Sequence, residues 1–161
     1  MATESNREKL RALIHAFIRK FGLLNQTRTP CGMPISVSDA HALMELLKTP
    51  NIDQMDLSNK LGLSKSATTR LVQRLKRRGQ INRFRSPDDG RAYNLKLTEK
   101  GKRQAEMINR ESLATFGTII SGLSDDAIGQ LLDFLPLLIE ALPGSSHKSN
   151  SKYTEKRSNH E

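Results

Sequence analysis

Cysteine is almost absent from this chain. Cys31 is the only one among 161 residues, so no disulfide can form within the chain. No cluster of cysteine and histidine has the spacing of a zinc site. The sequence also lacks an apolar run near the ~18 residues of a membrane span, and its first residues lack the apolar core of a signal peptide. We therefore expect a cytoplasmic protein that has no membrane contact and binds no metal.

Signatures of catalysis are missing too. The sequence shows no pair of carboxylates placed for acid–base chemistry, no nucleophile with a neighbouring base and no glycine loop that would cradle a phosphate. The adjacent acids Asp88 and Asp89 are followed by Gly90, a composition typical of a tight turn. We expect no catalytic residue, no cofactor and no enzymatic activity.

Positive charge is abundant and unevenly spread. The net charge is +9, from 26 Lys and Arg against 17 Asp and Glu. Residues 60–103 hold fourteen basic and three acidic residues, a net +11, so the rest of the chain carries a net −2. A basic segment of this kind indicates a nucleic-acid partner when it coincides with a DNA-binding fold.

The stretch that begins at Asp53 predicts a helix-turn-helix. A short helix opens at Asp53 or Asp56, and Gly62 permits the positive φ that a tight turn requires. Ser64 then caps a second helix over 65–78. Its inward side chains recur at i, i+3, i+4 and i+7 and are Thr68, Leu71, Val72 and Leu75.

The other face of this second helix must point outward. In a helix-turn-helix protein the second helix lies in the major groove, with its N-terminal residues at the base edges. We therefore predict that the outward face contacts DNA. Its residues are Lys65, Ser66, Thr69, Arg70, Gln73 and Arg77.

A two-stranded wing is predicted next. Residues alternate over 81–85 and 93–97 as in strands, and a turn at 87–90 joins them. A ribbon tipped by Arg85 and Arg91 is shaped to lie along the DNA backbone and to insert an arginine into the minor groove.

Two predicted helices precede this winged segment. Residues 4 to about 25 carry one apolar stripe, which is long enough to face another chain as well as a core of its own. Ser36 or Ser38 caps the next helix, roughly 38–48, which ends before Pro50 because proline disfavours helix at the residue preceding it.

Two more helices are predicted after the wing. Thr98 caps one that runs to about residue 121, and Ser124 caps the last. We expect the apolar residues of the last helix to be buried, namely Ile128, Leu131, Leu132, Leu135, Leu138 and Ile139. From residue 143 the sequence is polar and without periodicity, which predicts a disordered tail.

These patterns predict a mainly α (α+β) protein, a winged helix-turn-helix with long N- and C-terminal dimerisation helices. We expect an N-terminal dimerisation helix and loop at 1–35 and a winged helix-turn-helix DNA-binding domain at 36–98. C-terminal dimerisation helices at 99–142 and the tail at 143–161 complete the chain.

The wing carries the most specific motif in the sequence. The pattern Asp-x-Arg-x-x-x-Leu-x-Leu-Thr is present without a gap, as Asp89, Arg91, Leu95, Leu97 and Thr98. In this motif and in its helical layout the chain resembles the multiple-antibiotic-resistance regulator (MarR) family of bacterial winged-helix proteins. The resemblance implies a homodimer joined through the N- and C-terminal helices, and a pseudo-palindromic double-stranded DNA operator.

The resemblance also implies roles for individual residues. Arg91 takes the part of the wing arginine that enters the minor groove, oriented by Asp89, while Ser66, Thr69 and Arg70 contact bases. Combined with the outward helix face, the predicted DNA-binding residues are Ser64, Lys65, Ser66, Thr69, Arg70, Gln73, Arg74, Arg85, Asp89 and Arg91.

Many members of the family lose DNA affinity when a small, often aromatic acid binds between the dimer helices and the winged domain, and others sense oxidants. His15 and His41 are our candidate effector contacts, although a lone histidine on an apolar face is more often structural. Redox-sensing members keep their cysteine within the first helix, whereas Cys31 lies in the loop after it with only Arg28 as a basic neighbour. We expect Cys31 to be an inert thiol.

The sequence thus predicts a sequence-specific DNA-binding regulator, a repressor whose DNA affinity is modulated by a small aromatic or organic acid. Two alternatives stay open. One is a winged-helix module whose basic face binds an acidic protein partner, and the other is a redox-sensing regulator that acts through Cys31.

Overall fold

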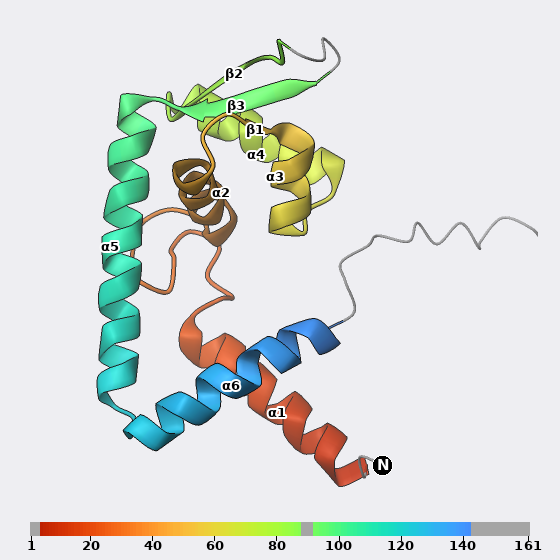
Figure 1. Ribbon diagram of the computed structural model, residues 1–161, viewed down its shortest axis with the longest axis vertical. Helices are drawn as coiled ribbons and strands as arrows, with labels where there is room; N and C mark the ends of the chain where they lie inside the picture. Colours follow the sequence, from red (N-terminus) through yellow and green to blue (C-terminus); the bar gives the residue numbers. More distant parts are fainter. Residues whose placement is uncertain (1–3, 88–91, 143–161) are drawn as a thin grey trace, which may run out of the picture.

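The computed structural model describes residues 4–87 and 92–142, and within them the fold is mainly helical with one small sheet (Figure 1). The predicted mainly α winged-helix class is confirmed. The elements in chain order are α1 (Glu4–Phe21), α2 (Val37–Lys48), β1 (Ile52–Asp53), α3 (Gln54–Leu61), α4 (Lys65–Arg77), β2 (Ile81–Arg85), β3 (Tyr93–Leu97), α5 (Glu99–Ser121) and α6 (Asp125–Ala141).

Side-chain caps set where most of the helices begin. At each of these caps a hydroxyl or carboxylate oxygen accepts a backbone N–H from the first turn, a group that otherwise has no partner in the helix. Of the sequence alternatives, Ser36 rather than Ser38 caps α2, and Asp53 rather than Asp56 caps α3. The remaining caps are as predicted and are Ser64, Thr98 and Ser124.

The sheet is antiparallel, in the order β1-β3-β2. The predicted hairpin is confirmed, with Ile81 opposite Leu97 and Arg85 opposite Tyr93. The strand β1 was not predicted, because two residues are too few to show alternation. It pairs Ile52 with Leu95 and so fastens the start of α3 to the middle of the wing.

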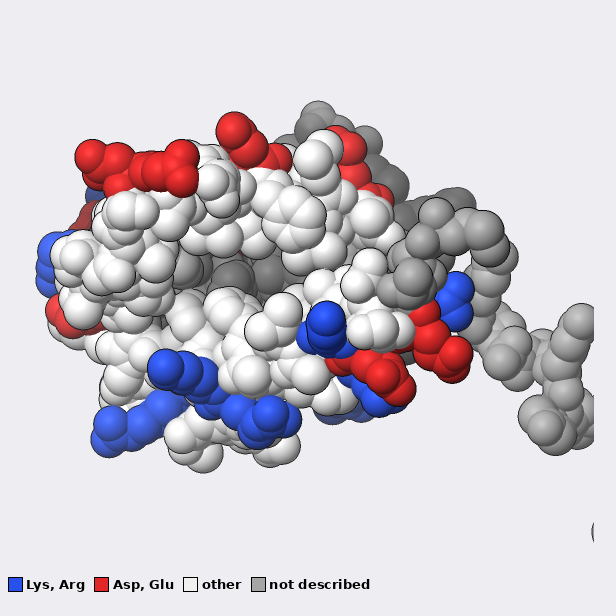
Figure 2. All heavy atoms as spheres, turned by 90° about the horizontal axis from the view of Figure 1, so that it is seen from below, with Lys and Arg blue, Asp and Glu red and all other residues white. Residues whose placement is uncertain are grey.

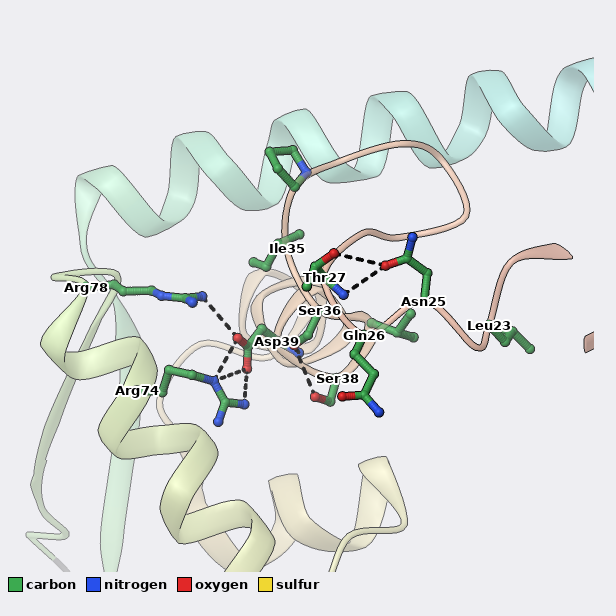
Figure 3. A pocket seen from close by; sticks show the side chains of 12 residues that line it. Leu23, Asn25, Gln26, Thr27, Ile35, Ser36, Ser38, Asp39, Arg74 and Arg78 are labelled. Carbon is green, nitrogen blue, oxygen red and sulfur yellow. Dashed lines mark hydrogen bonds and ion pairs between the residues drawn. The ribbon is translucent and has the colours of Figure 1, made fainter. Parts of the chain in front are cut away.

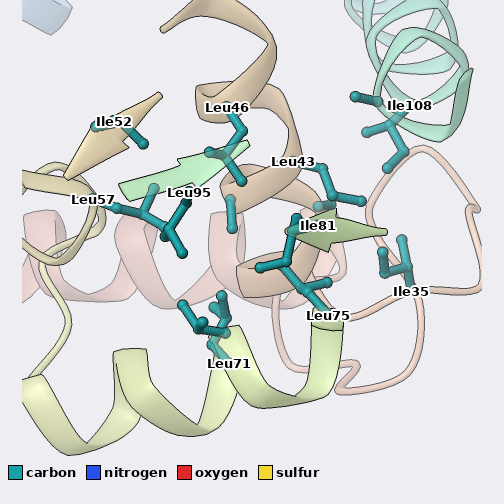
Figure 4. Close-up of a cluster of buried hydrophobic side chains, with 14 residues drawn as sticks. Ile35, Leu43, Leu46, Ile52, Leu57, Leu71, Leu75, Ile81, Leu95 and Ile108 are labelled. Carbon is teal, nitrogen blue, oxygen red and sulfur yellow. The ribbon is translucent and has the colours of Figure 1, made fainter. Parts of the chain in front are cut away.

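One hydrophobic core joins the helix-turn-helix to the sheet and to α5 (Figure 4). The inward face predicted for α4 is confirmed, because each of its residues is at most 2% exposed. The largest side chains buried in this core are Leu43, Leu46, Leu57, Leu71, Leu75, Ile81, Leu95 and Ile108.

The two terminal helices differ from the prediction. Helix α1 ends at Phe21 rather than near residue 25, because the chain turns at Gly22 with φ +82°. The predicted burial of the apolar residues of α6 is wrong for the described chain, in which neither α1 nor α6 has a buried residue. Leu131 and Leu135 are 42% and 39% exposed, although α6 and α1 cross at this end of the molecule in the view of Figure 1.

None of the helices in the described ranges combines the length and the apolar character that a membrane crossing requires.

Candidate nucleic-acid interface

The turn between α3 and α4 is held by a chain of short hydrogen bonds. Gly62 ends α3 in the left-handed conformation, with φ 61° and ψ 30°, as the tight turn requires. The Ser58 hydroxyl donates to the Leu63 carbonyl at 2.7 Å and accepts from the buried Thr68 hydroxyl at 3.1 Å. These bonds fix the direction in which α4 leaves the turn.

Helix α4 has two chemically opposite faces. Thr68, Leu71, Val72 and Leu75 are buried in the core. On the opposite side lies what we call the recognition face, which comprises Lys65, Ser66, Thr69, Arg70 and Gln73. Its members are exposed except for Thr69, which is half-buried. Ser64 caps the same helix end by accepting from the Ala67 N–H at 3.3 Å, so it lies beside this face.

Arg74, which the sequence groups with these residues, is half-buried and bound to α2, and its predicted contact with DNA stays a prediction. Asp39, at the start of α2, is only 1% exposed, and its carboxylate accepts two hydrogen bonds from Arg74 Nε at 2.9 and 3.1 Å. A third comes from Arg74 Nη2 at 2.5 Å, and Arg78 Nη1 donates to the same carboxylate at 3.1 Å (Figure 3). A buried carboxylate is stable only when it is paired, so both arginines neutralise Asp39 although their own side chains stay 36% and 49% exposed.

This pairing has an electrostatic consequence for α4. The hydrogen bond to Asp39 raises the pKa of the Arg74 guanidinium above its ordinary value, against the lowering effect of partial burial. Arg74 therefore stays charged at every physiological pH, and its charge is balanced by Asp39.

The wing carries one group of contacts that the sequence did not indicate. The Arg83 guanidinium carbon lies 3.4 Å from the centroid of the Tyr93 ring, and Arg83 Nε donates to Gln54 Oε1 at 3.0 Å. Gln54 Nε2 in turn donates to Thr69 Oγ1 at 3.4 Å. Gln54 has no periodic or motif signal, and the alternation of β2 shows only that Arg83 faces the side opposite Asn82.

Three predicted wing residues have different outcomes. Arg85 is exposed at the end of β2. Asp89 and Arg91 lie outside the described residues, so their roles stay predictions.

A second candidate site lies between α2, α5 and the loop that follows α1. It is a cavity of about 330 Å³ that we call the α2–α5 cavity. Apolar groups dominate its wall, which includes Phe21, Cys31, Val37, His41, Ile108 and Phe116.

The two candidate histidines differ in their placement. His41 lines the α2–α5 cavity, whereas His15 is exposed on α1 and is not part of its wall. Cys31 is half-buried there, with its sulfur 3.0 Å from the Thr29 hydroxyl. Among the described residues, the wall of this cavity contains no lysine or arginine that would favour a thiolate. Nor does any group of three or more His, Cys, Asp or Glu in those ranges have the placement of a metal site.

Comparison with known proteins identifies relatives of the winged segment. Residues 35–93 match the model of the MarR family. The chain is 29% identical over 101 residues to the uncharacterised HTH-type transcriptional regulator YdgJ of Bacillus subtilis, a match that covers 63% of this chain. It spans 62% of that relative, which is less than two thirds of its length.

Solved structures share the fold over most of the chain. FabT of Streptococcus pneumoniae, solved in complex with DNA, is 26% identical with a TM-score of 0.64, and the match covers 83% of this chain and 92% of that one. PcaV of Streptomyces coelicolor, solved in complex with its natural ligand, is 25% identical with a TM-score of 0.63, covering 82% and 89%. Residues 35–93 of this chain therefore match the MarR family, and the fold around that segment is similar to that of these two solved structures.

Proposed function

We propose that this protein is a homodimeric transcriptional regulator that binds a pseudo-palindromic double-stranded DNA operator and releases it when a small organic acid binds. The observation that carries the proposal is the recognition face. It is a basic and polar surface on the second helix of a helix-turn-helix, and the apolar side of that helix is buried.

The charge and geometry of α4 support DNA as the partner. Lys65 and Arg70 are exposed near its N-terminal half, where the helix-turn-helix geometry brings side chains to base edges. Gln73 is exposed one turn further along and can form paired hydrogen bonds with adenine. FabT, which shares this fold, was solved with DNA.

Exposed apolar residues support the dimer. Viewed from the end where α1 and α6 lie, most of the surface belongs to uncharged residues, with charged groups at its margins (Figure 2). A large area of exposed apolar side chains marks a protein interface. Its large exposed residues include Leu13 and Phe17 of α1, Leu113 and Phe116 of α5, and Leu131, Leu132, Leu135 and Ile139 of α6.

A two-fold dimer dictates the form of the operator. Two recognition helices that enter successive major grooves on one side of the duplex require half-sites ~34–36 Å apart. A dimer that covers both half-sites excludes other proteins from that DNA, so we propose repression as the sign of regulation. A reporter gene under the selected operator should be less active when this protein is present.

Selection of bound sequences from a random duplex pool tests the DNA-binding proposal. We expect an inverted repeat. Arg70→Ala should weaken binding to the selected operator more than binding to unrelated DNA, whereas Arg110→Ala, which removes the same charge from α5, should change neither strongly. If the wild-type protein enriched no sequence, the proposal would be rejected. If Arg70→Ala lowered the affinity for the selected operator and for unrelated DNA equally, Arg70 would be a phosphate contact instead.

The α2–α5 cavity supports a small-molecule effector. Its volume of about 330 Å³ is at the lower end of the ~300–1,000 Å³ usual for ligand sites, and such sites combine apolar walls with few polar groups. His41 and the hydroxyls of Ser112 and Thr115 supply those polar groups here. PcaV, with the same fold, was solved with a ligand.

Effector binding is tested by a thermal-shift screen of aromatic carboxylates. A true effector must bind the DNA-free protein more tightly than the DNA-bound protein. Operator DNA must then lower the protein's affinity for the effector by the same factor by which the effector lowers the protein's affinity for DNA. We expect His41→Ala to weaken the hit, and His15→Ala to serve as the control because His15 does not line this cavity. A hit whose affinity is the same with and without DNA is not an effector.

A further inference from the structure

We propose that Gln54 is a positioning residue that links the recognition helix to the wing and determines which group Thr69 presents to a base. This inference rests on the proposed DNA-binding function. Gln54 is the first residue of α3 and is half-buried, outside the hydrophobic core.

Both ends of the Gln54 amide are engaged. Its Nε2 donates to Thr69 Oγ1 on α4 at 3.4 Å, and its Oε1 accepts from Arg83 Nε on β2 at 3.0 Å. The amide is planar and rigid, so these two bonds relate the positions of α4 and β2. Arg83 is further held against the Tyr93 ring, which lies 3.4 Å from its guanidinium carbon.

The hydrogen bonds of Thr69 limit what it can offer to DNA. Its hydroxyl donates to the Lys65 carbonyl at 2.9 Å, so its proton is used within the helix. A hydroxyl has one donor and two acceptor positions, and Gln54 occupies one of the acceptors. What remains for a base is one acceptor lone pair and the methyl group.

The free acceptor and the methyl group of Thr69 favour particular bases. An acceptor pairs with the amino group of adenine or cytosine in the major groove, and a methyl group packs against the methyl of thymine. Guanine presents only the acceptors N7 and O6 there, so it faces another acceptor and is disfavoured. The geometry therefore predicts that guanine is excluded opposite Thr69, and that Gln54 maintains the exclusion by keeping the hydroxyl from turning.

The test compares base preferences of full-length variants selected on the same random duplex pool. In Gln54→Ala the Thr69 hydroxyl loses one of its two restraints and is held only by the Lys65 carbonyl, so it can turn away from that carbonyl and donate to a base more often. The frequency of guanine at one symmetric pair of positions should then rise about 3- to 10-fold, the range for one hydrogen bond. Met55→Ala is the matched control, because Met55 is the adjacent exposed residue of α3 and lines one cleft together with Gln54, Thr69 and Arg83. It should leave the preference unchanged.

A double-mutant cycle separates this role from a merely structural one. If Gln54 acts through Thr69, Gln54→Ala added to Thr69→Val should not change the preference at that position any further. Gln54→Met provides a second variant in case Gln54→Ala folds poorly. It keeps the length of the side chain but can neither donate to Thr69 nor accept its proton strongly, so guanine should again be tolerated.

The outcomes distinguish this inference from the proposed function. A wild-type protein that enriches no sequence rejects DNA reading altogether, and the role of Gln54 with it. A wild-type inverted repeat combined with an unchanged preference in Gln54→Ala and Gln54→Met overturns the role of Gln54 alone. A further change in the double variant relative to Thr69→Val would also overturn it.

Discussion

At the scale of single residues, a buried glycine decides how closely α5 approaches the end of the recognition helix. Gly101 lies in the first turn of α5, and a Cβ there would collide with the backbone carbonyl of Gln80. That carbonyl accepts from the Thr98 N–H at 3.0 Å, and the Thr98 hydroxyl accepts from the Gly101 N–H at 3.0 Å. The Gln80 carbonyl and the backbone of residue 101 are therefore both held by hydrogen bonds, and neither can easily move to make room for a Cβ.

Gly101→Ala should lower the free energy of unfolding by about 1–3 kcal/mol, the usual cost of overpacking a tight contact. Urea denaturation measures it. Gly117→Ala, in the same helix with nothing within 4 Å of its Cβ position, is the control and should be neutral or stabilising by up to about 1 kcal/mol. Equal effects of the two substitutions would contradict the close approach at Gly101.

A second residue-scale prediction concerns Arg91, whose role rests on the family resemblance. Arginine suits a narrow, negative minor groove because it is weakly hydrated and holds a planar fork of donors. Arg91→Ala should make the slope of log affinity against log salt shallower by about 2 for the dimer, near 0.9 per lost contact.

Asp89→Asn should weaken binding and leave that slope almost unchanged, because it affects only the orientation of Arg91. A salt slope in Arg91→Ala equal to that of wild type would show that the wing does not contact DNA. The alternative, a module for an acidic protein partner, would then become the leading interpretation.

At the scale of elements, α2 connects the recognition helix to the α2–α5 cavity. Its buried Asp39 is paired with Arg74 of α4 and with Arg78, the residue that caps the end of α4, while Val37, His41 and Met44 of α2 line the cavity. The raised pKa of Arg74 adds stability that is complete below the ordinary arginine pKa and is lost only above it. It therefore contributes no pH dependence of stability between pH 5 and pH 9.

Asp39→Ala should destabilise the protein by roughly 2 kcal/mol, since it removes charged hydrogen bonds to arginines that remain partly solvated. Urea denaturation is again the measurement. Asp56→Ala removes an exposed carboxylate from the first turn of α3 and should cost no more than about 1 kcal/mol, the helix-dipole contribution. If Asp39→Ala were as mild as this control, the ion pairs would not anchor α4 to α2.

At the scale of the whole molecule, the free chain presents apolar surface that a stable monomer would bury. Helix α6 exposes Leu132, Phe134, Leu137 and Ile139, each more than half accessible. The proposed dimer would cover this surface with a second copy of this chain, because each copy presents the same apolar surface to the other.

Charged substitutions on α6 test this interface. The wild-type protein should sediment at about twice 18.1 kDa. Leu131→Glu combined with Leu135→Glu should give monomer or insoluble protein, because it buries two charges at the interface of each subunit. Met55→Glu makes the same kind of change on α3 and should leave the dimer intact. An unaffected dimer in the double variant would refute the assignment of α6.

The sequence by itself determined the local features of this protein. Gly62, the caps Ser64 and Thr98, and the strands at 81–85 and 93–97 were predicted because each depends on conformational preference, a nearby hydrogen bond or periodicity. The recognition face followed from the inward face of α4, since the two faces are complementary on one helix.

Only the tertiary structure decided the features that depend on residues distant in the chain. Asp39 and Arg74 are 35 residues apart, and no periodicity shows that this arginine would pair with a buried carboxylate. The bridge from Gln54 to Thr69 and Arg83, the two-residue β1 and the α2–α5 cavity likewise arise from packing between separate elements. The exposure of α6 has the same origin, because a hydrophobic pattern shows that a face must be covered but not whether its own chain covers it.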